Sequence, residues 1–396
     1  MQLQRTLMAP MALVFMVFGM TGFAMPVLPL HVHHTLGMSS FVVGLVAGSQ
    51  FAASLVSRFW SGQLCDRRGP GPALRAGLIA ASTSGLLYLL SLRFVDSPGA
   101  SVAMLLLGRA LLGGAESFVV TAALAWGIAA AGPNQSGQVI SWIGIAMYVS
   151  FALGAPIGSA LYAVEGFAAI GAATFLVPVL ALPLLRRVPV SAPNAPAAAH
   201  ESWRSTLRAV WQPGLGLALS SLGFAAVTTF ITLLFASRGW APVWAGFSAF
   251  AGAFVLARVI GAHLPDQHGG ARIALVSLCV EVLGLLTVAL ATSPWLALLG
   301  ATLAGLGYSL VFPGFGLEVV RRAPAGHRAL ALGSYAACLD LALGTSGPML
   351  GLLADVAGLP WVFGASALVV LLAAAMAAHL MRHTAAIPCC PREATP

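Results

Sequence analysis

The sequence predicts an all-α integral membrane protein in which twelve transmembrane helices form two similar halves of six. Of its 396 residues, 59% are hydrophobic and only 8% are charged, whereas soluble domains carry about 25% charged residues. Apolar runs of about 20 residues, long enough to cross roughly 30 Å of hydrocarbon, recur along the chain. A short skeleton also occurs twice, 200 residues apart: Arg58, Leu64, Asp66, Gly69 and Arg258, Leu264, Asp266, Gly269.

The first half contains six apolar runs, at residues 8–30, 40–60, 74–94, 101–126, 138–162 and 166–185. Their apolarity is continuous rather than alternating, which indicates helices and not the strands of a membrane barrel. The first run resembles a signal peptide in position. Its length of about 23 residues and the spans that follow favour a retained helix instead.

A long polar break follows the sixth run. Two arginines precede a stretch rich in Pro, Ala and Asn, and the basic segment from Trp203 to Arg208 comes next. This composition suits a flexible cytoplasmic linker with a short interfacial helix. The chain therefore divides into an N-terminal bundle (1–185), a linker (186–212), a C-terminal bundle (213–385) and a cytoplasmic tail (386–396).

The second half repeats the pattern of the first, with apolar runs at 213–236, 242–262, 272–291, 294–317, 329–354 and 360–381. Two further sequence similarities between the halves support a duplication. Gly113, Glu116 and Ser117 of the fourth run correspond to Gly305, Tyr308 and Ser309 of the tenth, and the fifth and eleventh runs share Leu-Gly followed by a Pro/Gly cluster. Duplicated bundles are typical of carriers that alternate access to a central site.

The charge distribution indicates topology rather than a polyanionic partner. All nineteen basic residues are arginine, and the formal net charge is +8. With the N-terminus inside, sixteen arginines fall on the cytoplasmic side, two (Arg93 and Arg238) fall outside, and Arg109 lies within a span. This bias places both termini in the cytoplasm. The five cysteines lie in spans or on the cytoplasmic side, so no disulfide framework is expected.

Three motifs carry a family resemblance. The turn Gly62-Gln-Leu-Cys-Asp66-Arg67-Arg68-Gly69 resembles the signature loop of the major facilitator superfamily, and Arg109-Ala-Leu-Leu-Gly113 is similar to a motif of its proton-coupled members. Gly154-Ala-Pro156-Ile-Gly158 partly resembles the antiporter pattern, which Gly347-Pro348-Met-Leu-Gly351 fits better.

Along almost the whole chain, segments such as Leu55-Val-Ser-Arg58 and Asp340-Leu-Ala-Leu-Gly344 look like the bacterial YhhS-type efflux permeases. That group is often labelled arabinose-efflux or drug-efflux permeases. The resemblance implies the fold of the superfamily, a monomer in the bacterial inner membrane, and export of a drug, sugar or siderophore.

Four ionisable side chains fall well inside spans: Arg109, Glu116, Glu281 and Asp340. A charge at the bilayer centre costs from about 2.5 kcal/mol upward, so each needs a partner or a watery cavity. Arg109 and Glu116 are seven residues apart, which puts them on nearly one helix face about 10 Å apart. We expect Glu116 and Asp340 to carry protons, with Arg109 as electrostatic partner or substrate anchor; structural pairing is the alternative. For Glu281, a structural hydrogen bond or a protonated state on the lipid side is expected.

The resemblance implies a gating role for the turn after the second span. Asp66, with Arg67, Arg68, Arg58, Gly62 and Gly69, would latch the two bundles in the outward-open state; a merely solvated turn is the alternative. The second copy is degraded, because Gln267 and His268 replace the two arginines.

Polar and aromatic side chains near mid-span are candidates for shaping a substrate cavity, although any one of them could simply pack. They are Gln50, Trp142, Tyr148, Thr228, Thr229, Phe230, Trp244, Phe247, Tyr308 and Phe312. His31, His33 and His34 could bind a metal, but an exposed loop cluster is the expectation.

The sequence excludes some energy sources and leaves alternatives for function. A chain without lysine cannot form the usual phosphate-binding loop, and no zinc spacing appears, so neither cofactor nor metal is expected. Partners are the lipid bilayer, a small-molecule substrate and protons, not nucleic acid. The favoured hypothesis is a proton-coupled exporter. An uptake carrier or uncoupled facilitator, and a membrane sensor or scaffold without transport, are the alternatives.

Overall fold

The computed structural model describes residues 2–131, 136–187, 203–323 and 328–384, and within these ranges it contains only helices and their connections. Eleven helices of the described part are long and apolar enough to cross a membrane, and α8 is a shorter apolar helix. The all-α membrane fold is thereby confirmed. The central part of the predicted linker (188–202) and the tail with Cys389 and Cys390 lie outside the described residues.

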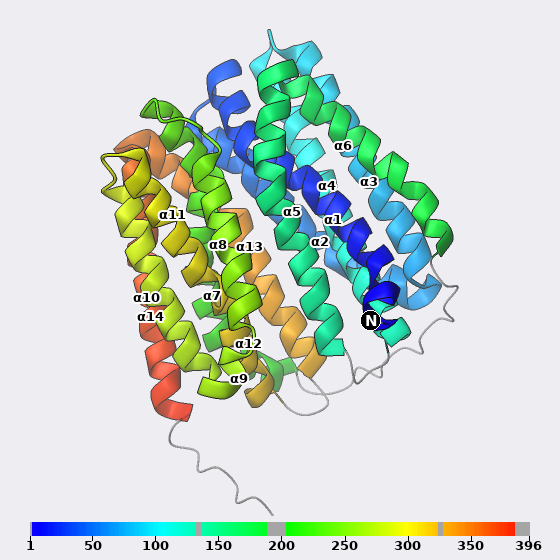
Figure 1. Ribbon diagram of the computed structural model, residues 1–396, viewed down its shortest axis with the longest axis vertical. Coiled ribbons are helices and arrows are strands. Elements are labelled where there is room, and N and C mark those ends of the chain that lie inside the picture. The colour runs from blue at the N-terminus through cyan, green and yellow to red at the C-terminus, as the bar shows by residue number, and fades with distance from the viewer. Residues whose placement is uncertain (1, 132–135, 188–202, 324–327, 385–396) are drawn as a thin grey trace, which may run out of the picture.

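The N-terminal half consists of six main helices, which are coloured blue to green in Figure 1. Within it, α4 packs against α2 and α3, α1 packs against α5, and α3 packs against α6. The bounds are α1 (Gln2–Leu30), α2 (Ser40–Arg68), α3 (Pro70–Ser91), α4 (Pro98–Ala131), α5 (Ser136–Glu165) and α6 (Phe167–Ala181). Short turns follow α1 (His31–Thr35), α3 (Leu92–Phe94) and α6 (Leu182–Arg187).

The C-terminal half repeats this plan with two interruptions. Its elements are α7 (Trp203–Ser237), α8 (Ala245–Gly261), α9 (Leu264–His268), α10 (Gly270–Ala289), α11 (Pro294–Ser309), α12 (Val311–Arg322), α13 (Arg328–Ala357) and α14 (Leu359–Thr384). Proline explains both interruptions. Pro265 and Pro313 lack the N–H that would bond the carbonyl four residues earlier, and α8 and α11 end at those residues, Gly261 and Ser309.

The duplicated turns have the same backbone geometry. Gly69 and Gly269 both adopt a positive φ (+79° and +90°), a conformation that glycine reaches at little steric cost. The Gly69 N–H donates to the Cys65 carbonyl at 2.9 Å, and the Gly269 N–H donates to the Pro265 carbonyl at 3.0 Å. The sequence repeat is therefore also a structural repeat.

One helix differs from its expected form. The basic segment that begins at Trp203 continues into the seventh span as a single helix, α7, rather than forming a separate interfacial helix. Ala209 and Val210, directly after this segment, are buried. Burial of these residues favours an unbroken helix at the point where the break was expected.

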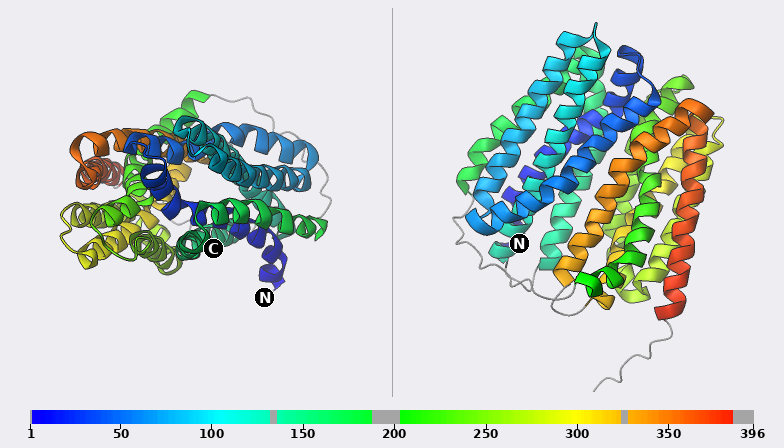
Figure 2. Two further views of the ribbon diagram at one scale, coloured as in Figure 1. Left: turned by 90° about the horizontal axis from the view of Figure 1, so that it is seen from above. Right: turned by 180° about the vertical axis from the view of Figure 1, so that it is seen from behind.

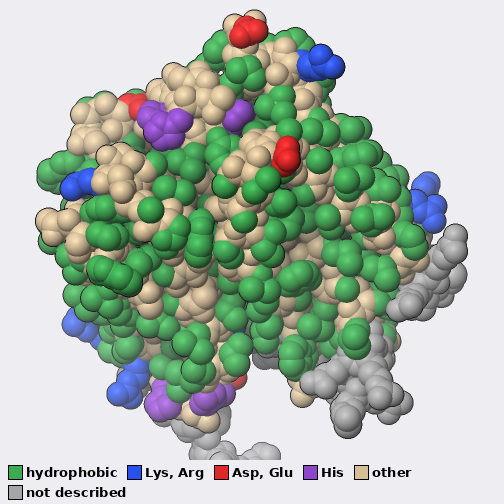
Figure 3. Space-filling view, turned by 45° about the horizontal axis from the view of Figure 1, so that its top comes forward, with side chains coloured by type: hydrophobic (Ala, Val, Ile, Leu, Met, Phe, Trp, Pro, Cys, Tyr) green, Lys and Arg blue, Asp and Glu red, His purple; other side chains and the backbone are tan. Residues whose placement is uncertain are grey.

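The two halves lie side by side (Figure 2), and both ends of the described chain lie at the same end of the molecule, which we call the termini face. Contacts between the halves run from α2 to α13, from α5 to α8 and from α1 to α7. Hydrophobic side chains cover most of the surface seen in Figure 3, and charged ones gather toward its margins, as expected for a lipid-facing protein.

The seam between α2 and α13 depends on glycine. A Cβ on Gly44 would overlap the carbonyl oxygen of Gly347, and a Cβ on Gly347 would overlap that of Gly44. Small residues of this kind let membrane helices approach closely. The two halves are consequently in backbone contact near the face opposite the termini, where α2 begins.

Candidate functional site

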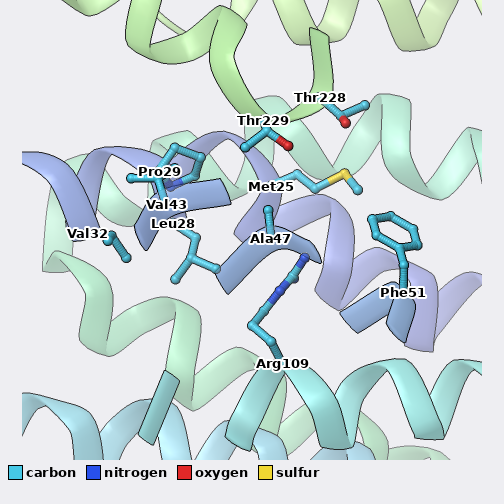
Figure 4. A pocket seen from close by; sticks show the side chains of 10 residues that line it. All are labelled: Met25, Leu28, Pro29, Val32, Val43, Ala47, Phe51, Arg109, Thr228 and Thr229. Carbon is cyan, nitrogen blue, oxygen red and sulfur yellow. The ribbon is translucent and has the colours of Figure 1, made fainter. Parts of the chain in front are cut away.

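A pocket lies between the two halves and is shown in Figure 4. Helices α1, α2 and α4 of the first half form three of its sides, and α7 of the second half forms the fourth. Its lining residues are Met25, Leu28, Pro29, Val32, Val43, Ala47, Phe51, Arg109, Thr228 and Thr229. Three of the residues singled out from the sequence, Arg109, Thr228 and Thr229, therefore meet in one place.

Arg109 is the ionisable residue of this lining. Its side chain is only 2% exposed, and its Nε and Nη1 atoms have no hydrogen-bond partner among the described residues. In Figure 4 it extends from α4 toward Ala47, while Thr228 and Thr229 lie on the opposite side. The buried Tyr88 side chain interacts with this guanidinium, but two buried nitrogen atoms without partners are costly, so the position of Arg109 suits a site that a ligand or water completes.

Glu116 lies seven residues further along α4, about 10 Å toward the termini face. It is 6% exposed and forms a cluster with α1 and α2. Thr21 Oγ1 donates a hydrogen bond to Glu116 Oε1, and Gln50 Nε2 donates to Oε2 at 2.7 Å. The Oε1 atom of Gln50 has no partner among the described residues. The predicted residues Glu116 and Gln50 are thus brought together beneath the pocket.

Asp340 forms an ion pair between the halves. Arg58 Nε on α2 donates to Asp340 Oδ2 on α13 at 2.5 Å. The Asp340 side chain is 6% exposed and that of Arg58 is 44% exposed. The sequence grouped Arg58 with Asp66 on the gating turn; the structure instead pairs it with the second carboxylate expected to carry protons.

The rest of the expected gating set lies at the termini face. Asp66, Arg67 and Arg68 are exposed, and none forms an ion pair with another residue of the described ranges. Gly62 is half-buried on α2, and Gly69 ends that helix. In this conformation the turn does not hold the two halves together through charge pairs with described residues.

Three of the other cavity candidates lie where helices meet. Tyr148 on α5 packs on Phe254 of α8, with ring centroids 4.0 Å apart, and the Arg258 guanidinium stands 5.9 Å from the Tyr148 ring. Tyr308 shares a 3.2 Å hydrogen bond with Ser221. The Phe312 carbonyl accepts a 2.9 Å bond from the Tyr335 hydroxyl. Tyr148 therefore belongs to the contact between the halves, and Tyr308 and Phe312 lie within the second half.

The last four candidates are placed in packing positions. Phe230 and Phe247 are fully buried in the large core that includes the second half. Trp142 packs against the core of the first half, and Trp244 immediately precedes α8. None of these four is among the residues that line the pocket.

Sequence reasoning did not identify Thr21 or Asp355. Asp355 on α13 accepts hydrogen bonds from the backbone N–H groups of Ser40 (2.7 Å) and Phe41 (2.9 Å) at the start of α2. These amides lack partners within their own helix. A carboxylate of one half thus caps a helix of the other. The sequence feature that could have identified Asp355 is an acidic residue near the end of a span, which lies opposite a helix start in the other half.

Glu281 and His31 lie in surroundings that differ from expectation. Glu281 is 1% exposed, lies against Gly223 of α7, and has no hydrogen-bond partner among the described residues for either oxygen. It therefore faces the bundle interior rather than lipid, and no described residue donates a hydrogen bond to it. His31 is 2% exposed and stacks on Phe167 at 4.2 Å, because the expected loop is a helical turn.

Metal ligation finds no support in the part of the chain that the structure describes, since no group of three or more His, Cys, Asp or Glu side chains there could hold an ion.

Comparison with known proteins gives consistent matches. The family model described as Major Facilitator Superfamily matches residues 11–269 and 246–388. An uncharacterised MFS-type transporter of Pseudomonas aeruginosa (strain UCBPP-PA14) is 40% identical over 367 residues, covering 92% of this chain and 90% of that one. The uncharacterised MFS-type transporter YhhS of Escherichia coli (strain K12) is 37% identical over 346 residues, covering 87% and 85%.

Solved structures match in fold. The inward-facing, unoccupied form of a bacterial homologue of the human lysosomal transporter Spinster has a TM-score of 0.76 at 14% identity, covering 96% of this chain and 97% of that one. The nucleoside transporter NupG (D323A mutant) has a TM-score of 0.73 at 13% identity, covering 95% and 99%.

Proposed function

The chain belongs to the major facilitator superfamily, and we propose that within it this membrane transporter exports a small organic molecule in exchange for protons. It would act as a monomer in the bacterial inner membrane with both termini in the cytoplasm, by alternating access between the two halves. The arginine distribution supports this orientation. Candidate substrates are a drug, a sugar or a siderophore, as for the efflux permeases that the chain resembles.

The observation that carries the proposal is the buried cluster of Thr21, Gln50 and Glu116, which lies about 10 Å along α4 from Arg109 of the pocket. Burial disfavours the charged form of a carboxyl group, whereas hydrogen bonds donated to it favour that form. Such opposed influences suit a group that gains and loses a proton during a cycle. Because Thr21, Gln50 and Glu116 lie on three different helices, movement of these helices would change the environment of the carboxyl group.

Asp340 supplies a second link between protonation and movement. Its partner Arg58 lies on the other half, so a proton taken up by Asp340 would remove the charge that attracts the guanidinium. The contact between α2 and α13 would then weaken. We propose that Glu116 senses protons near the substrate and that Asp340 transmits their arrival to the gap between the halves.

The turn with Asp66, Arg67 and Arg68 would act in the opposite state. Its side chains are exposed here, and Arg58 is engaged by Asp340. When the halves close at the termini face, the turn would meet the other half and Arg58 would exchange partners. The second turn, with Gln267 and His268, would make a weaker latch.

The test uses inside-out membrane vesicles and purified protein in liposomes. Metabolites that accumulate outside overexpressing cells, relative to deletion cells, identify the substrate. Its uptake into vesicles should then rise with an imposed acid interior, because entry into these vesicles corresponds to export. Glu116→Gln should abolish the response to the pH gradient.

Glu281→Gln is the matched control, because Glu281 is also buried but lies in the second half, on a helix that does not line the pocket. It should retain the gradient response. Transport by Glu116→Gln that still follows the pH gradient would refute proton coupling through this residue. Transport by the wild type that ignores the gradient indicates a facilitator, binding without transport indicates a sensor, and either result refutes the proposed function.

A further inference from the structure

The pocket carries a buried positive charge that forms no ion pair with a carboxylate of the described residues. The guanidinium of Arg109 has two nitrogen atoms without partners among the described residues, and the other nine lining residues are uncharged. Removing an ion from water without a counter-charge costs several kcal/mol. A protein that keeps such a group in its substrate pocket gains a strong attraction for an anion.

Glu116, on the same helix, is a candidate counter-ion for Arg109, but its carboxylate is hydrogen-bonded to other residues. Glu116 is displaced by about 10 Å along α4, and its two oxygens accept hydrogen bonds from Thr21 and Gln50. Asp340 is bound to Arg58, and Asp355 caps α2. None of these three carboxylates is hydrogen-bonded to Arg109, and Glu116 acts on its charge only at longer range.

The remaining walls define what else the ligand must present. Met25, Leu28, Val32, Val43 and Phe51 form an apolar surface beside Arg109. Across the pocket lie the two threonines of α7 (Figure 4); the Thr228 hydroxyl donates to the Phe224 carbonyl at 2.8 Å, which leaves its oxygen able to accept a hydrogen bond. The lining thus combines one cation, two hydroxyls and a hydrophobic wall.

We propose that the transported solute is an organic monoanion, with a carboxylate or a similar planar anionic group bound by Arg109 and a compact apolar body held by α1 and α2. This inference rests on the proposed transport function and specifies its substrate class. A guanidinium matches a carboxylate through paired hydrogen bonds. A cationic solute would meet repulsion from Arg109, and a polyanion would lack further cations among the lining residues.

Ligand binding can be tested without knowing the natural substrate. The purified protein in detergent is titrated with benzoate, cinnamate and indole-3-acetate, and with benzylamine and benzyl alcohol as cationic and neutral analogues. Thermal stabilisation of the protein reports binding. At least one carboxylate should stabilise the wild type, with affinity more than tenfold above that of either analogue, since a charge-assisted bond is worth about that factor or more.

Arg109→Gln should reduce carboxylate affinity at least tenfold, and Arg109→Lys, which keeps the charge but not the planar fork, should retain part of it. Equal stabilisation by benzyl alcohol, or an unchanged carboxylate response in Arg109→Gln, would overturn the proposal. So would the absence of stabilisation by all three carboxylates, or an equal effect of sodium chloride at the same concentration, which would indicate an inorganic anion.

The outcome is separable from that of the proton-coupling test. Glu281→Gln should still bind carboxylates, because its side chain lies in the second half and is not part of the pocket lining. If carboxylates bind through Arg109 but transport ignores a pH gradient, the substrate class stands and the coupling fails. If transport follows the gradient but the solute is neutral or cationic, the coupling stands and this inference fails.

Discussion

Three of the buried carboxyl groups in the spans, Glu116, Asp340 and Glu281, have different surroundings, and these differences set their expected roles. Glu116 accepts two hydrogen bonds beside the pocket, Asp340 pairs with an arginine of the other half, and Glu281 has no hydrogen-bond partner in the described ranges. A carboxyl group without a partner in an apolar interior is stable mainly when neutral. We therefore expect protons to act at Glu116 and Asp340 during transport and to stay on Glu281.

The Arg58–Asp340 pair predicts unequal effects of its two neutralising substitutions. Arg58→Gln leaves a buried carboxylate without its partner, whereas Asp340→Asn leaves an arginine that is 44% exposed and can turn toward solvent. Arg58→Gln should therefore destabilise the protein more than Asp340→Asn, as measured by thermal unfolding in detergent. Adding Asp340→Asn to Arg58→Gln should restore part of the loss, with a coupling energy of about 0.5–3 kcal/mol.

Independent, additive effects of the two substitutions would show that the pair does not stabilise this state. Arg321→Gln is a suitable control, because Arg321 has a similar side-chain exposure of 45% but pairs with Glu318 on its own helix. Its effect on stability should not depend on Asp340, because the two ion pairs share no residue.

At the scale of elements, we propose that the seam between α2 and α13 acts as a gate near the face opposite the termini. The gate combines backbone contact between Gly44 and Gly347 with the Asp355 carboxylate that caps α2. A capping carboxylate is worth about 0.5–2 kcal/mol, and it must leave the α2 amides if the halves separate there. The gate is therefore closed in this structure by packing and hydrogen bonds of ordinary strength.

Substitution of the seam glycine should open this gate. Gly44→Ala places a Cβ against the Gly347 backbone, and overpacking of this kind costs about 1–3 kcal/mol. In a cysteine-free background carrying Thr228→Cys, it should increase the reaction of the pocket cysteine with an impermeant maleimide added from the outer side of intact cells. A shift of 1.4 kcal/mol corresponds to about a tenfold change in population.

The matched control for that experiment is Gly19→Ala on α1, where an added Cβ meets no atom within 4 Å. It should leave the labelling rate unchanged. Equal labelling rates for Gly44→Ala and the parent would show that the glycine contact does not hold the gate closed.

At the scale of the whole molecule, the sequence predicted the membrane fold and its duplication well. Span length and continuous apolarity depend on the bilayer rather than on tertiary packing, so they can be recognised from the sequence alone. The helix breaks before Pro265 and Pro313 follow from the missing proline N–H. The prediction of spans from apolar runs did not take this local effect into account. The continuity of α7 through Ala209 and Val210 depended on burial, which the local composition does not reveal.

The site was only partly predictable, because it depends on which helices meet. Costly charges in spans identified Arg109, Glu116 and Asp340, and their depths along the helices followed from residue spacing. The partners did not: Thr21 and Gln50 reach Glu116 from two other helices, and Arg58 crosses to Asp340 over 282 positions of sequence. Aromatic candidates such as Phe230 and Phe247 are buried in the core. The sequence could not distinguish them from ligand contacts, because packing and ligand contact favour the same residue types.

The coupling of Glu116 to movement of the halves is tested most directly by distances between spin labels as a function of pH. In a cysteine-free background, one pair at exposed positions 97 and 292 reports the face opposite the termini, and a pair at 67 and 267 reports the termini face. Lowering the pH should shift the two distance distributions of the wild type in opposite directions. Glu116→Gln should show the acidic distributions at every pH, whereas distributions that still follow pH as in the wild type would contradict proton coupling through Glu116.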